Sequence, residues 1–256
     1  MILIPFIISN SVRLYYEVRG NGKPIVLIHH LAGNYKSWKF VIPKLTLDST
    51  VVVYDLRGHG RSSTPNSPYN IEEHSSDLRG LLVQLGMEKP VLVGHSIGSL
   101  IAIDYALKYP VEKLILVGAL YKAPSPEVYE KYVRIAVNFG LRALAEYRRL
   151  HKEFAETLVS NYHAWNSLLE VYEETTPIGY KNAVEGLLKA KDYSDELREI
   201  NVNTLLVYGT YDGLITNMNV FKNNMKNVET KTIEGYGHFL NFENPSLLSD
   251  IIKNFL

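Results

Sequence analysis

The chain has 256 residues, of which 46% are hydrophobic, and its 27 Lys and Arg residues balance its 27 Asp and Glu residues. This balance gives no overall field that would favour nucleic acid, an anionic membrane or an acidic partner, so we expect none of these partners. Because the sequence contains no cysteine, disulfide bonds, thiolate zinc sites and a cysteine nucleophile are excluded. No apolar run is long enough to span a membrane, and residues 1–8 lack the features of a signal peptide, so we expect a cytoplasmic protein.

Apolar runs alternate with helical patterns along the first half of the chain. The predicted strands cover residues 1–8, 12–18, 24–28, 50–54, 91–93 and 113–118. The predicted helices cover residues 37–47, 71–85 and 97–109. Strands that alternate with helices in this way predict a parallel sheet that is covered by helices on both faces.

Residues 122–200 interrupt the alternation, because they contain helical patterns rich in aromatic residues and no convincing strand. Strand character returns at residues 203–209 and 229–234, and an amphipathic helix is predicted over residues 245–256. The sequence therefore predicts an α/β fold with a mostly parallel, doubly wound, eight-stranded sheet.

Two units follow from this interruption. We expect residues 1–121 and 201–256 to form the core of the sheet, and residues 122–200 to form an inserted helical cap. The cap is aromatic and has no blocks of charge, so we expect it to cover an apolar pocket.

The segment Gly94-His95-Ser96-Ile97-Gly98 joins a predicted strand to a predicted helix, which is the context that gives the pattern G-x-S-x-G its meaning. The glycines leave room for a sharp turn that holds the serine hydroxyl away from the sheet. The helix after the turn directs free N–H groups toward negative charge beside Ser96. We predict that Ser96 is a nucleophile; the alternative is a plain connection with a surface serine.

A serine nucleophile needs a base and an acid that orients the base. His238 lies between the last predicted strand and the last helix, in a loop with two glycines, and is the candidate base. Asp212 follows the preceding strand and is the candidate acid, although an Asp beside a glycine is often only a turn residue. The order Ser, Asp, His is the one that accompanies this type of serine turn.

An oxyanion that develops during acyl transfer needs two hydrogen-bond donors. The N–H of Ile97, which directly follows Ser96, is the first candidate. The second candidate is the N–H of Leu31, in the loop after the strand at residues 24–28.

These motifs resemble the α/β-hydrolase family, and the resemblance extends over nearly the whole chain. The segments that carry it are Gly94-His95-Ser96-Ile97-Gly98, Asp55-Leu56-Arg57-Gly58-His59-Gly60-Arg61-Ser62, Gly209-Thr210-Tyr211-Asp212 and Gly237-His238-Phe239. Within the family the chain looks most like the group of small-molecule esterases and 3-oxoadipate enol-lactonases. This resemblance implies the α/β-hydrolase fold, a Ser-His-Asp triad and a small ester or lactone as substrate.

The chain departs from the family at His30, where a glycine is usual. The imidazole can pack behind the oxyanion loop, or it can face the acyl pocket. We include His30 and Trp165 as candidate substrate-binding residues. Arg57 and His59, in the polar loop after the fourth strand, are expected to form local hydrogen bonds in a structural turn.

The function predicted from the sequence is hydrolysis of a small carboxylic ester or lactone through an acyl-enzyme. No spacing of His, Asp or Glu indicates a metal site, and no cofactor is expected. The same three residues could instead catalyse carbon–carbon bond hydrolysis or cofactor-free perhydrolysis. A ligand receptor with slow or single-turnover hydrolysis is the alternative from a different functional class.

Overall fold

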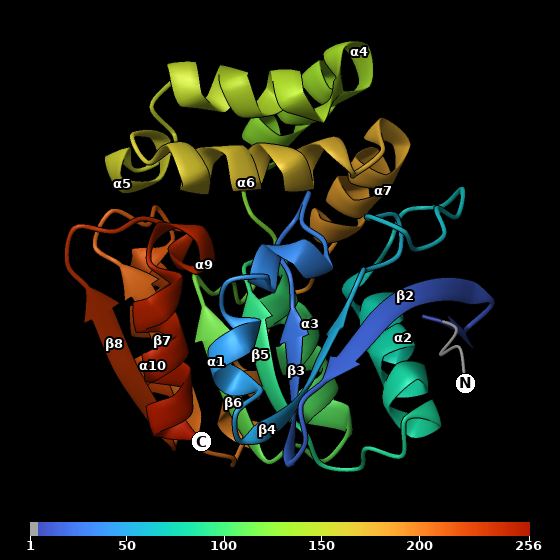
Figure 1. Cartoon of the computed structure of the whole chain (residues 1–256), viewed down its shortest axis with the longest axis vertical. Coiled ribbons are helices and arrows are strands. Elements are labelled where there is room, and N and C mark those ends of the chain that lie inside the picture. The colour runs from blue at the N-terminus through green and yellow to red at the C-terminus, as the bar shows by residue number, and fades with distance from the viewer. Residues whose placement is uncertain (1–4) are drawn as a thin grey trace.

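The computed structural model describes residues 5–256, which contain an eight-stranded sheet with the strand order β1-β2-β4-β3-β5-β6-β7-β8 (Figure 1). The strands are β1 (Phe6–Ser9), β2 (Val12–Arg19), β3 (Lys23–Ile28), β4 (Ser49–Tyr54), β5 (Val91–His95), β6 (Lys113–Val117), β7 (Thr204–Gly209) and β8 (Val228–Ile233). β2 runs antiparallel to both β1 and β4, and the other neighbours are parallel. The predicted fold class is confirmed. The beginning of the strand predicted over residues 1–8 lies outside the described residues.

Two helical layers cover the sheet, as the alternation predicted. On one face lie α2 (Ile71–Gln84), α3 (Ile97–Lys108) and α8 (Met218–Asn224), and on the other lie α1 (Ile42–Leu45) and α10 (Pro245–Phe255). Successive residues of β3 alternate between the two cores: Val26 packs with the first layer and Leu27 with the second. No helix within residues 5–256 combines the length and the apolar character needed to cross a membrane.

The helix predicted over residues 37–47 is replaced by two short pieces, the 3₁₀ helix η1 (Tyr35–Trp38) and α1. Pro43 lies in the first turn of α1, where its missing N–H costs nothing. In the middle of a longer helix the same proline would remove a hydrogen bond and disfavour helical geometry before it, so the chain starts a new helix there.

Between β6 and β7 the chain forms four helices above the carboxyl ends of the strands (Figure 1). These are α4 (Pro126–Leu150), α5 (Glu156–Val159), α6 (Tyr162–Glu173) and α7 (Pro177–Leu187). They have an apolar cluster of their own, in which Leu144, Leu168 and Val184 are buried. Gly140 interrupts α4 with φ 87° and ψ 169°, which divides the helix into two parts. No strand occurs among residues 122–200.

Candidate active site

Ser96 lies at the sharp turn between β5 and α3, with φ 57° and ψ −118°. A positive φ is unfavourable for a residue with a side chain, and such strain persists only where the surrounding structure imposes it. A Cβ atom on Gly94 would clash with the carbonyl oxygen of Gly98, and one on Gly98 would lie 2.5 Å from the carbonyl oxygen of Ile28. The two glycines therefore allow β5, α3 and β3 to approach closely enough to form the turn.

His238 and Asp212 lie in loops that follow β8 and β7, and they form a direct pair. His238 Nδ1 is 2.9 Å from Asp212 Oδ2. The other carboxylate oxygen, Oδ1, accepts the N–H of Leu214 at 2.9 Å. Because a carboxylate only accepts hydrogen bonds, Nδ1 carries the proton and Nε2 of the neutral imidazole is left as a proton acceptor.

Gly118, directly after β6, lies against this pair and has φ 52°. A Cβ atom at this position would be 2.6 Å from His238 Nδ1 and 2.8 Å from Asp212 Oδ2. The Asp212–His238 contact therefore requires a glycine here. Gly118 is not among the site residues predicted from the sequence, although a glycine immediately after a buried strand was a usable signal.

Glu243, in α9 (Leu240–Glu243), holds the loop that carries His238. Its carboxylate accepts the N–H of Gly237 and the N–H of Phe239, both at 2.8 Å. His95 Nε2 donates to the carbonyl oxygen of His238 at 2.8 Å. The backbone on both sides of His238 is thus fixed, which restricts the position of its imidazole.

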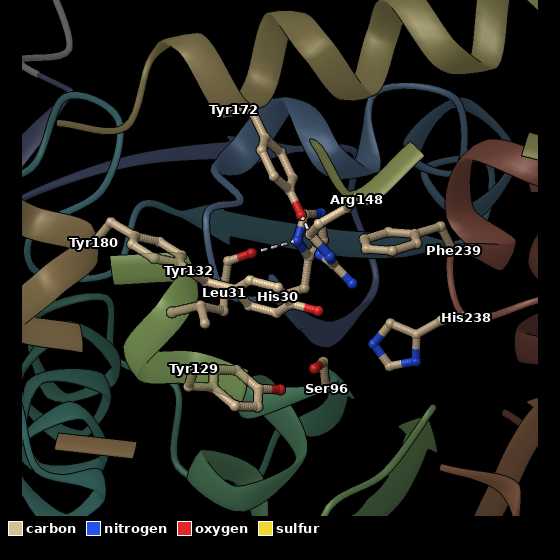
Figure 2. A pocket seen from close by; sticks show the side chains of 10 residues that line it. All are labelled: His30, Leu31, Ser96, Tyr129, Tyr132, Arg148, Tyr172, Tyr180, His238 and Phe239. Carbon is tan, nitrogen blue, oxygen red and sulfur yellow. Dashed lines mark hydrogen bonds between the residues drawn. The ribbon is translucent and has the colours of Figure 1, made fainter. Parts of the chain in front are cut away.

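Two cavities meet at Ser96. The inner cavity, of about 50 Å³, is lined by His30, Leu31, Ser96, Tyr129, Tyr132, Arg148, Tyr172, Tyr180, His238 and Phe239 (Figure 2). The outer cavity, of about 470 Å³, is lined by Ser96, Pro124, Ser125, Val128, Tyr129, Tyr132, Arg148, Glu153, Asp212, Gly213, Leu214 and His238. Ser96 and His238 line both cavities. Among the described residues 5–256, their two side chains are not hydrogen-bonded to each other. Distances between catalytic groups are often longer before substrate binds.

Of the two candidate oxyanion donors, Leu31 lines the inner cavity and Ile97 directly follows Ser96. Neither N–H is engaged by another group of the described chain, and the N–H of Ile97 is at the start of α3. Two buried histidines connect the loop of Leu31 to the loop after β4. His29 accepts the N–H of Leu56 at 3.0 Å, and His59 accepts the N–H of Ala32 at 3.3 Å.

The structure combines the two alternatives for His30. Its ring is completely buried, with the centroids of the His95 and Phe239 rings each 5.1 Å away. Nδ1 donates to the carbonyl oxygen of Leu31 at 2.9 Å, and Nε2 is 3.3 Å from Ser37 Oγ. The ring also forms part of the inner wall. Burial lowers the pKa of His30 to about 3, so the imidazole is neutral near pH 7.

The expectation of an apolar pocket is wrong for the inner cavity, whose wall is mainly polar, whereas the wall of the outer cavity is mainly apolar. Arg148, near the end of α4, extends into both cavities together with the hydroxyl-bearing rings of Tyr129 and Tyr132. Figure 2 shows the Arg148 guanidinium beside Tyr172 and the Tyr129 hydroxyl directed toward Ser96. From the sequence, the tyrosines of this segment were recognised only as aromatic residues. Arg148 was not predicted to line the site, because a charged residue at a helix end is usually solvated.

Trp165 needs a correction. Its side chain is 6% exposed and packs in the apolar cluster of the helical segment, with its ring 5.6 Å from that of Phe154. It is not among the residues that line either cavity at Ser96. An aromatic side chain at helical spacing therefore serves packing here.

The polar loop after β4 forms local hydrogen bonds, as expected. Arg57 pairs with Asp77 through two hydrogen bonds of 2.7 and 2.8 Å and with Glu73 at 2.7 Å. His59 Nδ1 donates to the carbonyl oxygen of Arg57 at 3.0 Å. Within residues 5–256 no cluster of three or more His, Asp or Glu side chains is suited to a metal ion.

The sequence profile described as "alpha/beta hydrolase fold" matches residues 23–245, most of the chain. The chain belongs to the α/β-hydrolase family. A carboxylesterase structure from Nitrososphaera gargenis superimposes on this α/β hydrolase with a TM-score of 0.89 and 29% identity, over 98% of this chain and 97% of that one. An enol-lactonase structure from Burkholderia xenovorans LB400 has a TM-score of 0.90 at 24% identity, over 98% and 99% of the two chains, and shows the shared fold.

A relative from Synechocystis sp. carries the provisional name of a non-heme chloroperoxidase. It is 29% identical to this α/β hydrolase over 97% of the chain and 96% of its own length. The resemblance to esterases inferred from the sequence motifs is thus confirmed, and the protein is a hydrolase.

Proposed function

We propose that the protein hydrolyses small carboxylic esters or lactones through an acyl-enzyme on Ser96. The observation that carries this proposal is the strained turn at Ser96. Ser96 lines the same cavity as His238, whose imidazole is paired with Asp212. Strain at this buried turn is maintained by close backbone packing, and a nucleophile is a sufficient reason for it.

In the proposed reaction, Ser96 Oγ attacks the carbonyl carbon while His238 Nε2 takes the hydroxyl proton. The N–H groups of Leu31 and Ile97 donate to the oxyanion. The bond from carbon to the leaving oxygen then breaks, and His238 returns the proton to that oxygen. A water molecule, deprotonated by His238, attacks the acyl-enzyme; the bond from the acyl carbon to Ser96 Oγ then breaks, His238 returns the proton to Oγ, and the acid is released. Asp212 holds the imidazole in position and stabilises its positive charge.

We further propose that residues 122–200 act as a cap domain on a core formed by residues 1–121 and 201–256. This division is supported by the separate apolar cluster of α4 to α7 and by their position over the strand ends. In this proposal the cap supplies the walls that select the substrate, and the core supplies the reacting groups.

The test is the hydrolysis of p-nitrophenyl acetate and butyrate by the wild type and by Ser96→Ala. We expect kcat/KM to fall ~10³-fold or more in the variant, because covalent catalysis is lost while the oxyanion donors remain. Ser160→Ala is the matched control, because Ser160 is exposed, its Oγ donates to the carbonyl oxygen of Glu156, and it lines neither cavity. Retention of more than a tenth of the wild-type rate by Ser96→Ala would contradict the proposal.

Cofactor-free perhydrolysis is the second candidate, supported by the name of the Synechocystis relative. Here hydrogen peroxide, in place of water, attacks the acyl-enzyme and yields a peracid. Formation of peracetic acid from acetate and hydrogen peroxide, absent in Ser96→Ala, would identify this activity.

A further inference from the structure

The inner cavity differs from the outer one in its charge. Arg148 is the one permanently charged residue on its wall, and none of its ten lining residues is acidic. The carboxylates of Glu153 and Asp212 line the outer cavity only. An arginine is never deprotonated in proteins, so the inner cavity contains a positive charge at every pH where the protein is folded.

The guanidinium of Arg148 is held at one edge and is open at the other. Nε donates to Glu153 Oε2 at 3.0 Å, and Nη1 donates to the hydroxyl of Tyr172 at 2.8 Å (Figure 2). The guanidinium carbon also lies 4.5 Å from the centre of the Phe154 ring. Nη2 has no acceptor among residues 5–256. About a fifth of the Arg148 side chain is accessible, so a ligand can reach it. An arginine fixed in this way retains donors for a planar anion.

Two tyrosine hydroxyls on the same wall are also unengaged. Neither Tyr129 nor Tyr180 forms a side-chain hydrogen bond with another described residue, and both line the inner cavity. Burial raises the pKa of both phenols, so they remain protonated and can donate. The cavity thus combines hydrogen-bond donors with one cation, and it favours a negatively charged ligand that accepts hydrogen bonds.

We propose that this cavity binds a carboxylate on the acyl part of the substrate, so that the enzyme prefers esters or lactones of short, carboxylated acyl groups. The proposal rests on the proposed ester hydrolysis at Ser96. A volume of about 50 Å³ holds roughly four to five non-hydrogen atoms, which matches the carboxylate and two methylenes of a succinyl group. The acyl group occupies the small cavity because it stays bonded to Ser96, while the alcohol leaves through the wider one.

The first test compares monoethyl succinate with ethyl levulinate, in which a methyl group replaces one carboxylate oxygen at nearly the same size. We expect the kcat/KM ratio of succinate to levulinate ester to be roughly 10 to 100 in the wild type, because hydrogen bonds to charged groups strengthen binding by this factor. Arg148→Met keeps the length of the side chain and should reduce the ratio to about 1. Arg148→Lys should retain an intermediate ratio, because lysine supplies charge without the fork.

Arg149→Met is the matched control. Arg149 is adjacent in sequence, but its side chain is about half exposed and lies over Trp165 instead of in a cavity. We expect its ratio to equal that of the wild type. A wild-type ratio near 1, or an unchanged ratio in a folded Arg148→Met, overturns the proposal. So does a preference for acetoxyacetate over acetoxyacetone, which would place the carboxylate on the alcohol side.

A second measurement needs no turnover and no change at Arg148. Ser96→Ala, titrated by calorimetry, should bind monoethyl succinate at least ~10-fold more tightly than ethyl levulinate; equal affinities would contradict the carboxylate site. Hydrolysis of both esters at equal rates that depend on Ser96 would leave the proposed function intact and reject this inference. Binding preference without hydrolysis that depends on Ser96 would reject the proposed function alone.

Discussion

The two groups of residues that meet at the cavities are held in different ways. Ser96 and His238 are fixed by backbone packing at Gly94, Gly98 and Gly118, where a single added methyl group would clash. Arg148 is fixed by side chains, through an ion pair with Glu153 and a hydrogen bond to Tyr172. The strand ends therefore leave little room for change beside Ser96 and His238. In the proposed function, the sheet fixes the reacting groups and the side chains of the helices set the selectivity.

The largest expected effect is a loss of stability in acid, and it arises in the sheet region. Five buried histidines lie in the sheet region, and burial lowers the pKa of each below its usual value. They are His29, His30, His59, His74 and His95. The two histidines between residues 122 and 200, His151 and His163, are exposed.

In the unfolded chain these imidazoles bind protons near pH 6.5, whereas in the folded chain they remain neutral at that pH. The free energy of unfolding therefore falls with decreasing pH, by at most ~1.4 kcal/mol per pH unit for each histidine. Asp55, whose pKa is raised to about 7 by burial, and Asp77, whose pKa is also raised by burial, oppose this change. We expect stability in urea to decrease steeply from pH 6.5 to 4.5, and a flat profile would contradict the buried neutral histidines.

The second prediction concerns the packing at Gly118. Gly118→Ala should lower kcat at least ~100-fold, because the methyl group displaces the imidazole of His238 from Asp212. Gly86→Ala is the control, because Gly86 also has a positive φ, of 67°, but no atom near its Cβ position. Both variants should lose about 1 kcal/mol of stability from backbone strain. Equal kcat values for the two variants would show that Gly118 does not position the pair.

These examples indicate what the sequence could predict. Ser96, Asp212 and His238 follow strands and are flanked by glycines, so local patterns placed them at one edge of the sheet. Arg148 and Arg149 are indistinguishable in the sequence, yet one enters the cavities and the other covers Trp165. Adjacent residues of a helix point in different directions. Which of the two faces the cavities depends on how α4 packs against α6 and α7, and the local sequence does not show this packing.

The smallest effect is expected at the junction of the two regions. Lys39, just after η1, pairs with Glu170 of α6 at 2.8 Å, and both side chains are about a third or more exposed. Lys39→Met should change the free energy of unfolding by no more than ~1 kcal/mol. Lys44→Met is the control, because its partner Asp250 lies in the sheet region at 2.5 Å with similar exposure. A loss well above that of Lys44→Met would mean that this ion pair holds the helices onto the sheet.

Covalent labelling by a fluorophosphonate tests the central claim most directly, because the reagent reacts with an activated serine and requires no knowledge of the substrate. Intact-mass and peptide analysis should find one adduct per chain, on Ser96, and the labelling rate should fall sharply in His238→Ala. An adduct on another serine, or labelling of Ser96 that is independent of His238, would contradict the proposed nucleophile and base.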